Sequence, residues 1–125
     1  MPTSVKEMMA AANAAIPKIS PAQAQKLMRE KNALVVDVRD PAEVEASGKV
    51  KGAINIPRGM LEFRADDETQ HFDKSFSKDR PVIVYCASGG RSALSGKTLR
   101  DMGYTEVHNL GGFKDWAESG GEVEK

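Results

Sequence analysis

Short runs of β-branched and other apolar residues alternate with stretches of helical spacing along this chain. The runs at 34–38, 82–85 and 107–110 predict buried strands, and 52–57 predicts a further short strand and turn. Strands that alternate with helices imply a mostly parallel sheet that is covered on both faces. The pattern therefore predicts a three-layer α/β/α fold.

Cap signals set the ends of several helices. At 20–23, a serine N-cap, a proline at the first helical position and a capping-box glutamine predict a helix that runs to about residue 31. The segment 40–43 repeats this arrangement, and Gly48 would end the short helix that it opens. The spacing also predicts a helix from about residue 91 to Gly103. The residues on or near one side of this helix would be Leu94, Thr98, Leu99 and Met102.

Aromatic residues mark two less regular regions. Between 58 and 79 the pattern predicts short helical turns with apolar anchors, namely Phe63, Phe72 and Phe76. The stretch FKDWAESG predicts a last amphipathic helix. Its Phe113 and Trp116 are more typical of core anchors than of substrate contacts, because helical aromatic side chains usually pack.

The first residues differ in composition from the rest of the chain. An alanine-rich core at 8–16 resembles a weak signal peptide, but Asn13 interrupts it and an acidic residue precedes it. We interpret the segment as a short amphipathic helix that ends at Pro17. Residues 1–18 are thus expected to form an N-terminal helical extension, and residues 19–125 a single domain.

Composition excludes several classes of partner. With 18 basic and 18 acidic residues, no basic field exists to attract nucleic acid or an anionic membrane. A single cysteine excludes an intramolecular disulfide and suits a reducing compartment, so a cytoplasmic location is expected. His71 and His108 are isolated in the sequence, so no metal site is predicted.

That single cysteine, Cys86, begins the run CASGGRS directly after a predicted strand. Gly89 and Gly90 tolerate positive φ, so successive backbone N–H groups can point inward and form an anion-binding nest. A helix that begins near Arg91 would direct its N-terminus at the thiol. A helix N-terminus and a nearby cation both lower a cysteine pKa, so we interpret Cys86 as a thiolate nucleophile.

Two simpler interpretations are weaker. A lone cysteine is often an inert buried thiol, but here the glycine pair, the arginine and the helix all agree with a reactive one. A nucleotide-binding phosphate loop needs GxxxxGK followed by serine or threonine, and this sequence lacks that motif.

Four ordered segments resemble the rhodanese homology family of single-domain sulfurtransferases over about residues 19–121. They are VVDVRDPAEVEASG, GKVKGAINIPRGML, VIVYCASGGRS and NLGGFKDWAESGG. One departure is that Lys49 and Lys51 stand in GKVKGA, where the family commonly shows histidine and proline in a stretch similar to GHIPGA. The resemblance therefore gives no role to a histidine at this turn.

The resemblance implies transfer of a sulfane sulfur through a covalent Cys86 persulfide. A small anionic donor such as thiosulfate would supply the sulfur, and cyanide or a thiol such as glutathione or thioredoxin would accept it. No cofactor is implied. Arg91 would orient the sulfonate of the donor, and the loop would bind the substrate through Ala87, Ser88, Gly89, Gly90, Arg91 and Ser92.

Supporting roles are open for several charged residues. Asp37 could anchor the catalytic loop by accepting hydrogen bonds, or could instead cap a strand-to-helix turn. Arg39, Arg58 and Arg64 are candidate accessory cations for an anionic donor, although a solvated charge or an exposed ion pair is the more usual role of each.

Two other classes share features with this sequence. Dual-specificity cell-cycle phosphatases and certain arsenate reductases resemble it in fold, but their cysteine loop has one more residue before its arginine. The shorter ring from Cys86 to Arg91 leaves less room for a tetrahedral oxyanion, and the chain has no second cysteine to resolve an arsenate intermediate. A protein-partnered sulfur carrier or binding module is the other alternative.

Overall fold

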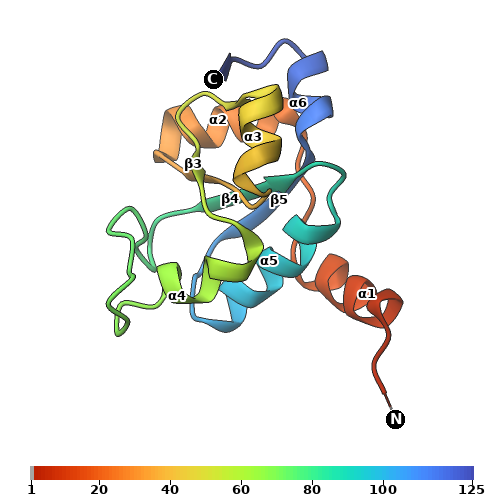
Figure 1. Ribbon diagram of the computed structural model, residues 1–125, viewed down its shortest axis with the longest axis vertical. Coiled ribbons are helices and arrows are strands. Elements are labelled where there is room, and N and C mark those ends of the chain that lie inside the picture. The colour runs from red at the N-terminus through yellow and green to blue at the C-terminus, as the bar shows by residue number, and fades with distance from the viewer. Residues whose placement is uncertain (1) are drawn as a thin grey trace.

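The computed structural model describes residues 2–125 and centres on a four-stranded parallel sheet (Figure 1). The strand order is β3-β1-β4-β5, and each neighbouring pair is parallel. This arrangement confirms the predicted α/β fold with a mostly parallel sheet. The strands are β1 (Leu34–Asp37), β3 (Ile54–Asn55), β4 (Val82–Cys86) and β5 (Val107–Gly112).

Helices cover both faces of this sheet, and two hydrophobic clusters define the faces (Figure 1). One cluster includes Ile16, which follows α1, together with Leu61 of α4 and Leu99 of α5. The other includes Ala24 of α2 and Trp116 of α6. The helices are α1 (Val5–Ala15), α2 (Pro21–Lys31), α3 (Pro41–Ser47), η1 (Arg58–Met60), α4 (Leu61–Ala65), α5 (Gly90–Asp101) and α6 (Phe113–Glu118).

The pleat of β4 decides which way Cys86 faces. Successive side chains of a strand point to opposite faces of the sheet. Val84 and Cys86 accordingly belong to the cluster beneath α4 and α5, whereas Ile83 and Tyr85 belong to the cluster beneath α2 and α6. The thiol therefore lies on the same face as α5, the helix that begins directly after its loop.

The predicted caps are present at the helix ends. Ser20 and Gln23 exchange reciprocal hydrogen bonds at the start of α2, and α3 begins after Asp40 with a second capping box. Gly48, with φ of 81°, follows the last residue of α3. In the part of the chain that is described, every helix is too short or too polar to serve as a membrane span.

Two local predictions need correction. Phe63 is 51% exposed, so it is not an apolar anchor, whereas Phe76 is buried and Phe72 is partly buried. The buried side of α5 is also smaller than the sequence predicted, because Leu94, Thr98 and Met102 are only partly buried. Small residues allow α5 to approach the sheet closely, and its buried residues are Ser92, Ala93, Ser95, Gly96 and Leu99.

A second, two-stranded antiparallel sheet was not predicted. It pairs β2 (Lys49–Val50) with β6 (Val123–Glu124). The Lys49 ammonium donates to the backbone oxygen of Ala53 at 2.8 Å and forms an ion pair with the carboxylate of Glu124. Lys49, one of the two lysines that depart from the family pattern, thus ties this turn to the C-terminal strand.

A buried ion pair joins the end of β1 to the end of α3. Asp37 is fully buried and accepts from the Arg39 guanidinium at 2.7 Å and from the Arg39 backbone N–H at 3.0 Å. The guanidinium also donates to Ser47 Oγ and to the Gly48 oxygen, and lies over the Phe113 ring. Asp37 therefore stabilises the turn after β1, and within residues 2–125 its carboxylate accepts hydrogen bonds from Arg39 and none from the 86–92 loop.

Replacing Asp37 tests how much this pair stabilises the fold. Asp37→Ala would leave the Arg39 guanidinium buried without its anion, so we expect the free energy of unfolding to fall by about 3–5 kcal/mol. Urea denaturation measures this loss. Asp101→Ala is the control, because it breaks the exposed Lys97–Asp101 pair, which should cost less than about 1 kcal/mol. Equal losses in the two variants would contradict the assignment.

Candidate active site

The loop between β4 and α5 holds Cys86 at the carboxyl edge of the parallel sheet, where ligands bind in folds of this class. Gly89 adopts φ of 106°, a conformation that favours glycine, whereas Gly90 does not have a positive φ. One left-handed residue is thus sufficient to turn the chain into α5. Ala87 and Ser88 are exposed at the tip of the loop.

The loop surrounds the Cys86 sulfur with hydrogen-bond donors. Cys86 is 1% exposed, and the Gly89 N–H donates to Sγ at 3.0 Å. Burial alone would raise the pKa of the Cys86 thiol. Hydrogen bonds from the Ser92 hydroxyl and from the backbone N–H groups of Ser92, Gly89 and Ser88 outweigh it, so the pKa is lowered overall. At neutral pH, the thiolate fraction therefore exceeds that of an ordinary thiol.

Ser92 links the sulfur to a residue that the sequence analysis did not single out. Its Oγ lies 3.5 Å from Cys86 Sγ and 2.7 Å from Asn109 Oδ1. Asn109 is buried on β5, and its Oδ1 also accepts from the Gly111 N–H at 2.8 Å. Because a serine hydroxyl has one hydrogen, it can donate to Asn109 beside a neutral thiol and turn to a thiolate when Cys86 loses its proton. A polar residue inside the apolar run VHNLGG was the only sequence signal for Asn109.

Arg91 lies at the rim of the loop but is paired with α3. Its guanidinium donates to the two carboxylate oxygens of Glu43 at 2.7 and 2.9 Å. These bonds lower the pKa of Glu43 to about 2 and raise the pKa of Arg91. Glu43 also accepts from the backbone N–H of Asp40 in the capping box of α3. In this structure Arg91 is therefore neutralised, and its sequence-predicted role toward a donor requires that it leave Glu43.

The end of β5 packs tightly against the loop. A Cβ on Gly112 would lie 2.7 Å from the Ala87 oxygen. Real Cβ atoms essentially never lie this close to another heavy atom, so this position needs glycine. A Cβ on Gly89 would lie 3.6 Å from the Gly111 Cα. The end of β5 therefore lies directly against the catalytic loop.

The three accessory arginines do not converge on the loop. Arg39 is 4% exposed and fully engaged by Asp37, Ser47 and Gly48, which does not fit the prediction of an accessory cation. Arg58 donates to Glu62 and to Thr98, and Thr98 lies about 10 Å along α5 from Arg91. Arg64 is exposed on α4.

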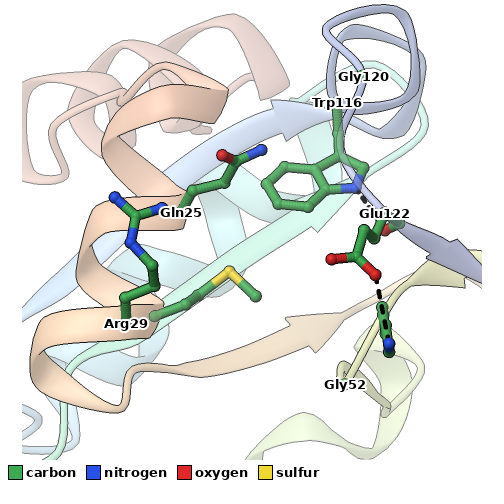
Figure 2. A pocket seen from close by; sticks show the side chains of 8 residues that line it. Gln25, Arg29, Gly52, Trp116, Gly120 and Glu122 are labelled. Atoms are coloured by element: carbon green, nitrogen blue, oxygen red, sulfur yellow. Dashed lines mark hydrogen bonds and ion pairs between the residues drawn. The ribbon is translucent and has the colours of Figure 1, made fainter.

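A cavity of about 540 Å³ lies away from the Cys86 loop, and neither the thiol nor its hydrogen-bond donors line it (Figure 2). Gln25 and Arg29 of α2 face Trp116 and Glu122 across it, and none of its lining residues belongs to the 86–92 loop. Residues 2–125 also contain no group of three or more potential metal ligands. The single thiol of the chain, Cys86, has a lowered pKa.

Residues 20–119 match the family model of the rhodanese-like domain, so the chain belongs to this family. The uncharacterized protein YqhL of Bacillus subtilis is 39% identical over 94 residues, which cover 74% of this chain and 65% of YqhL. The chain therefore spans less than two thirds of that relative. The human thiosulfate:glutathione sulfurtransferase is 30% identical over 112 residues, which cover 84% of this chain and 96% of the human protein. Other relatives are named thiosulfate sulfurtransferases.

One solved structure resembles the chain over almost its whole length. It is a Rhodopseudomonas palustris protein of unknown function described as a possible tyrosine phosphatase. The two share 39% sequence identity with a TM-score of 0.88, and the match covers 99% of each chain. The likeness thus includes the N-terminal helix, which lies outside the residues matched by the family model.

Removing the Ser92 hydroxyl tests its effect on the thiol. Ser92→Ala deletes the hydrogen bond that most lowers the Cys86 pKa, so the pKa should rise and the thiolate fraction at neutral pH should fall. A hydrogen bond worth about 1 kcal/mol corresponds to about fivefold slower alkylation by iodoacetamide at neutral pH, with little change at high pH. Ser88→Ala is the control, because it keeps the backbone N–H. An unchanged pH profile in Ser92→Ala would contradict this role.

Proposed function

We propose that this protein is a sulfurtransferase that carries a sulfane sulfur as a persulfide on Cys86. The observation that carries the proposal is the buried thiol with a lowered pKa, held 3.0 Å from the Gly89 N–H. Relatives named thiosulfate sulfurtransferases support this class of activity. The proposed reaction needs no cofactor, because sulfur itself is the group that is exchanged.

The proposed reaction has two displacement steps. The Cys86 thiolate attacks the outer sulfur of thiosulfate, the S–S bond of the donor breaks, and sulfite leaves with the electron pair. The terminal sulfur of the resulting persulfide carries a negative charge, which would be stabilised by the same backbone N–H groups of Ser88, Gly89 and Ser92 that lower the Cys86 pKa. A nucleophilic acceptor then takes the terminal sulfur, and the Cys86 thiolate leaves.

We further infer that the physiological acceptor is a thiol in a reducing compartment such as the cytoplasm. The name of the human relative, thiosulfate:glutathione sulfurtransferase, supports glutathione as the first acceptor to test. Thioredoxin is a second thiol of suitable chemistry. Cyanide would serve as an acceptor in the assay.

Phosphatase chemistry is the competing candidate, because the similar Rhodopseudomonas protein is described as a possible tyrosine phosphatase. Two features of this chain disfavour it. Only four residues separate Cys86 from Arg91, which makes a small ring. The Arg91 guanidinium is also bound to Glu43 rather than free to clamp a phosphate.

Intact mass measurement separates these functions. After exposure to thiosulfate, the protein should gain one sulfur atom, and cyanide or glutathione should remove it. Cys86→Ser should form no adduct, because serine is a far weaker nucleophile without a general base. Hydrolysis of an activated aryl phosphate should be negligible in both proteins. Efficient phosphate hydrolysis without any persulfide, from every donor tested, would show that the proposal is wrong.

Replacing Glu43 tests whether Arg91 acts on the donor. Glu43→Gln removes the anion that neutralises Arg91, and glutamine still fits the capping box of α3. We expect the KM for thiosulfate to fall severalfold. Arg91→Lys should lower kcat/KM by about tenfold or more, because lysine cannot replace a bidentate guanidinium.

Glu45→Gln is the matched control for Glu43→Gln, since Glu45 is exposed on the same helix and forms no ion pair with Arg91. Steady-state kinetics with thiosulfate and cyanide measure all three variants. If Glu43→Gln and Glu45→Gln change the KM equally, Arg91 does not act as proposed.

A further inference from the structure

A cavity of about 360 Å³ lies between the N-terminal segment and the candidate catalytic loop. Met9 and Asn13 of α1 form one wall, and Ser88, Gly89 and Gly90 of the loop form the other. α1 packs alongside α5, the helix that follows the loop (Figure 1). Among residues 2–125, Lys18 is the only charged residue that lines this cavity.

The backbone around Lys18 is fixed by an added bridge to the sheet. The segment 17–19 runs parallel to β5, where the Ile19 N–H donates to the Asn109 oxygen and the Asn109 N–H donates to the Pro17 oxygen, both at 3.0 Å. Backbone hydrogen bonds of Pro17 and Ile19 therefore hold Lys18 beside β5. The side chain of Lys18 takes no part in these bonds.

That side chain extends over the glycine pair that supports the loop. A Cβ placed on Gly111 would lie 3.0 Å from Lys18 Cε and 3.5 Å from its Nζ. Gly111 is in turn adjacent to Gly89, whose N–H donates to Cys86 Sγ. The ammonium thus lies on the β5 side of the loop, one residue removed from the donor to the sulfur.

Lys18 has no anionic partner among the described residues, whereas Arg91, on the opposite side of the loop, is paired with a carboxylate. There, Arg91 is neutralised by Glu43, and Asp40 adds a further negative charge nearby. Lys18 is exposed and forms no ion pair with any residue from 2 to 125. In the resting structure, the β5 side of the loop therefore carries net positive charge.

We propose that Lys18 determines the preference of Cys86 for anionic reactants, which approach the thiol along the cavity between α1 and the loop. That these reactants include thiosulfate rests on the proposed function. The charge preference itself does not, since it applies to any small anion that reacts with the thiol.

Alkylation with a matched pair of reagents tests the proposal without sulfur transfer. Iodoacetate is anionic and iodoacetamide is neutral, and both form a bond from Cys86 Sγ to carbon with loss of iodide. The ratio of their rate constants cancels changes in thiolate fraction. In Lys18→Ala the iodoacetate-to-iodoacetamide ratio should fall about threefold to tenfold, the effect of one partly screened charge at short range.

Three further variants sharpen the test. Lys18→Arg should keep the wild-type ratio, and Lys18→Glu should lower it below that of Lys18→Ala. Lys26→Ala is the control, because Lys26 is an exposed lysine of α2 that lines a different cavity. At about 0.5 M salt the wild-type ratio should approach that of Lys18→Ala, because the charge is screened. An unchanged ratio in Lys18→Ala would overturn the proposal.

Thiosulfate kinetics then connect this charge to the proposed function. Lys18→Ala should raise the KM for thiosulfate by a similar factor and leave kcat almost unchanged, because the ammonium attracts the donor and does not touch the sulfur. If the alkylation ratio falls but the wild type forms no persulfide, the role of Lys18 stands and the sulfurtransferase proposal fails. If persulfide forms and the ratio does not fall, only the role of Lys18 is overturned.

Discussion

The need to stabilise a buried sulfur anion constrains the whole carboxyl edge of this sheet. Removing an ionised group from water costs several kcal/mol of solvation free energy unless hydrogen bonds compensate for it. Cys86 is 1% exposed, and the Gly89 N–H at 3.0 Å is one of several donors that compensate its charge. The chain can present that N–H only because Gly89 adopts a positive φ. The conformation of one loop residue thus supplies one of the hydrogen bonds that lower the pKa of the thiol.

The same constraint extends to β5, which supports the loop from its far side. Gly112 leaves room for the Ala87 oxygen, and a side chain at this position would push the loop away. Asn109 holds both Ser92 and the backbone of Gly111 through one amide oxygen. Strand, loop and helix therefore form one hydrogen-bonded unit, so a change on β5 is expected to alter the pKa of a cysteine on β4.

The sequence was sufficient where a feature depends on neighbouring residues. The capping boxes at Ser20 and Asp40 set the starts of α2 and α3, and the apolar runs located the central strands. The paired strands β2 and β6 have two residues each, which is too short for an alternation to show. Arg39 resembled a free cation because its burial depends on the distant ring of Phe113.

Some residues of the candidate site could likewise be identified from the sequence, and others could not. The Cys86 loop is contiguous in sequence, so its residues could be identified together. Asn109, Glu43 and Lys18 reach the loop only through tertiary pairing, and no local pattern indicates that pairing. The sequence could show that Arg91 is close to the thiol but could not show that Glu43 occupies its guanidinium.

The N-terminal helix has a larger part in this arrangement than a simple extension would have. Ala12 and Ile16 are buried, and a Cβ on Gly96 of α5 would lie only 3.1 Å from Ile16 Cγ2, so α1 packs closely on the helix that follows the loop. The bridge from segment 17–19 to β5 then joins the same unit at Asn109. Because α1 also forms a wall of the cavity beside the loop, its packing on α5 sets the width of that cavity. If anionic reactants approach the thiol along this cavity, as proposed, the helix that stabilises this side of the fold also limits the size of the reactants that reach it.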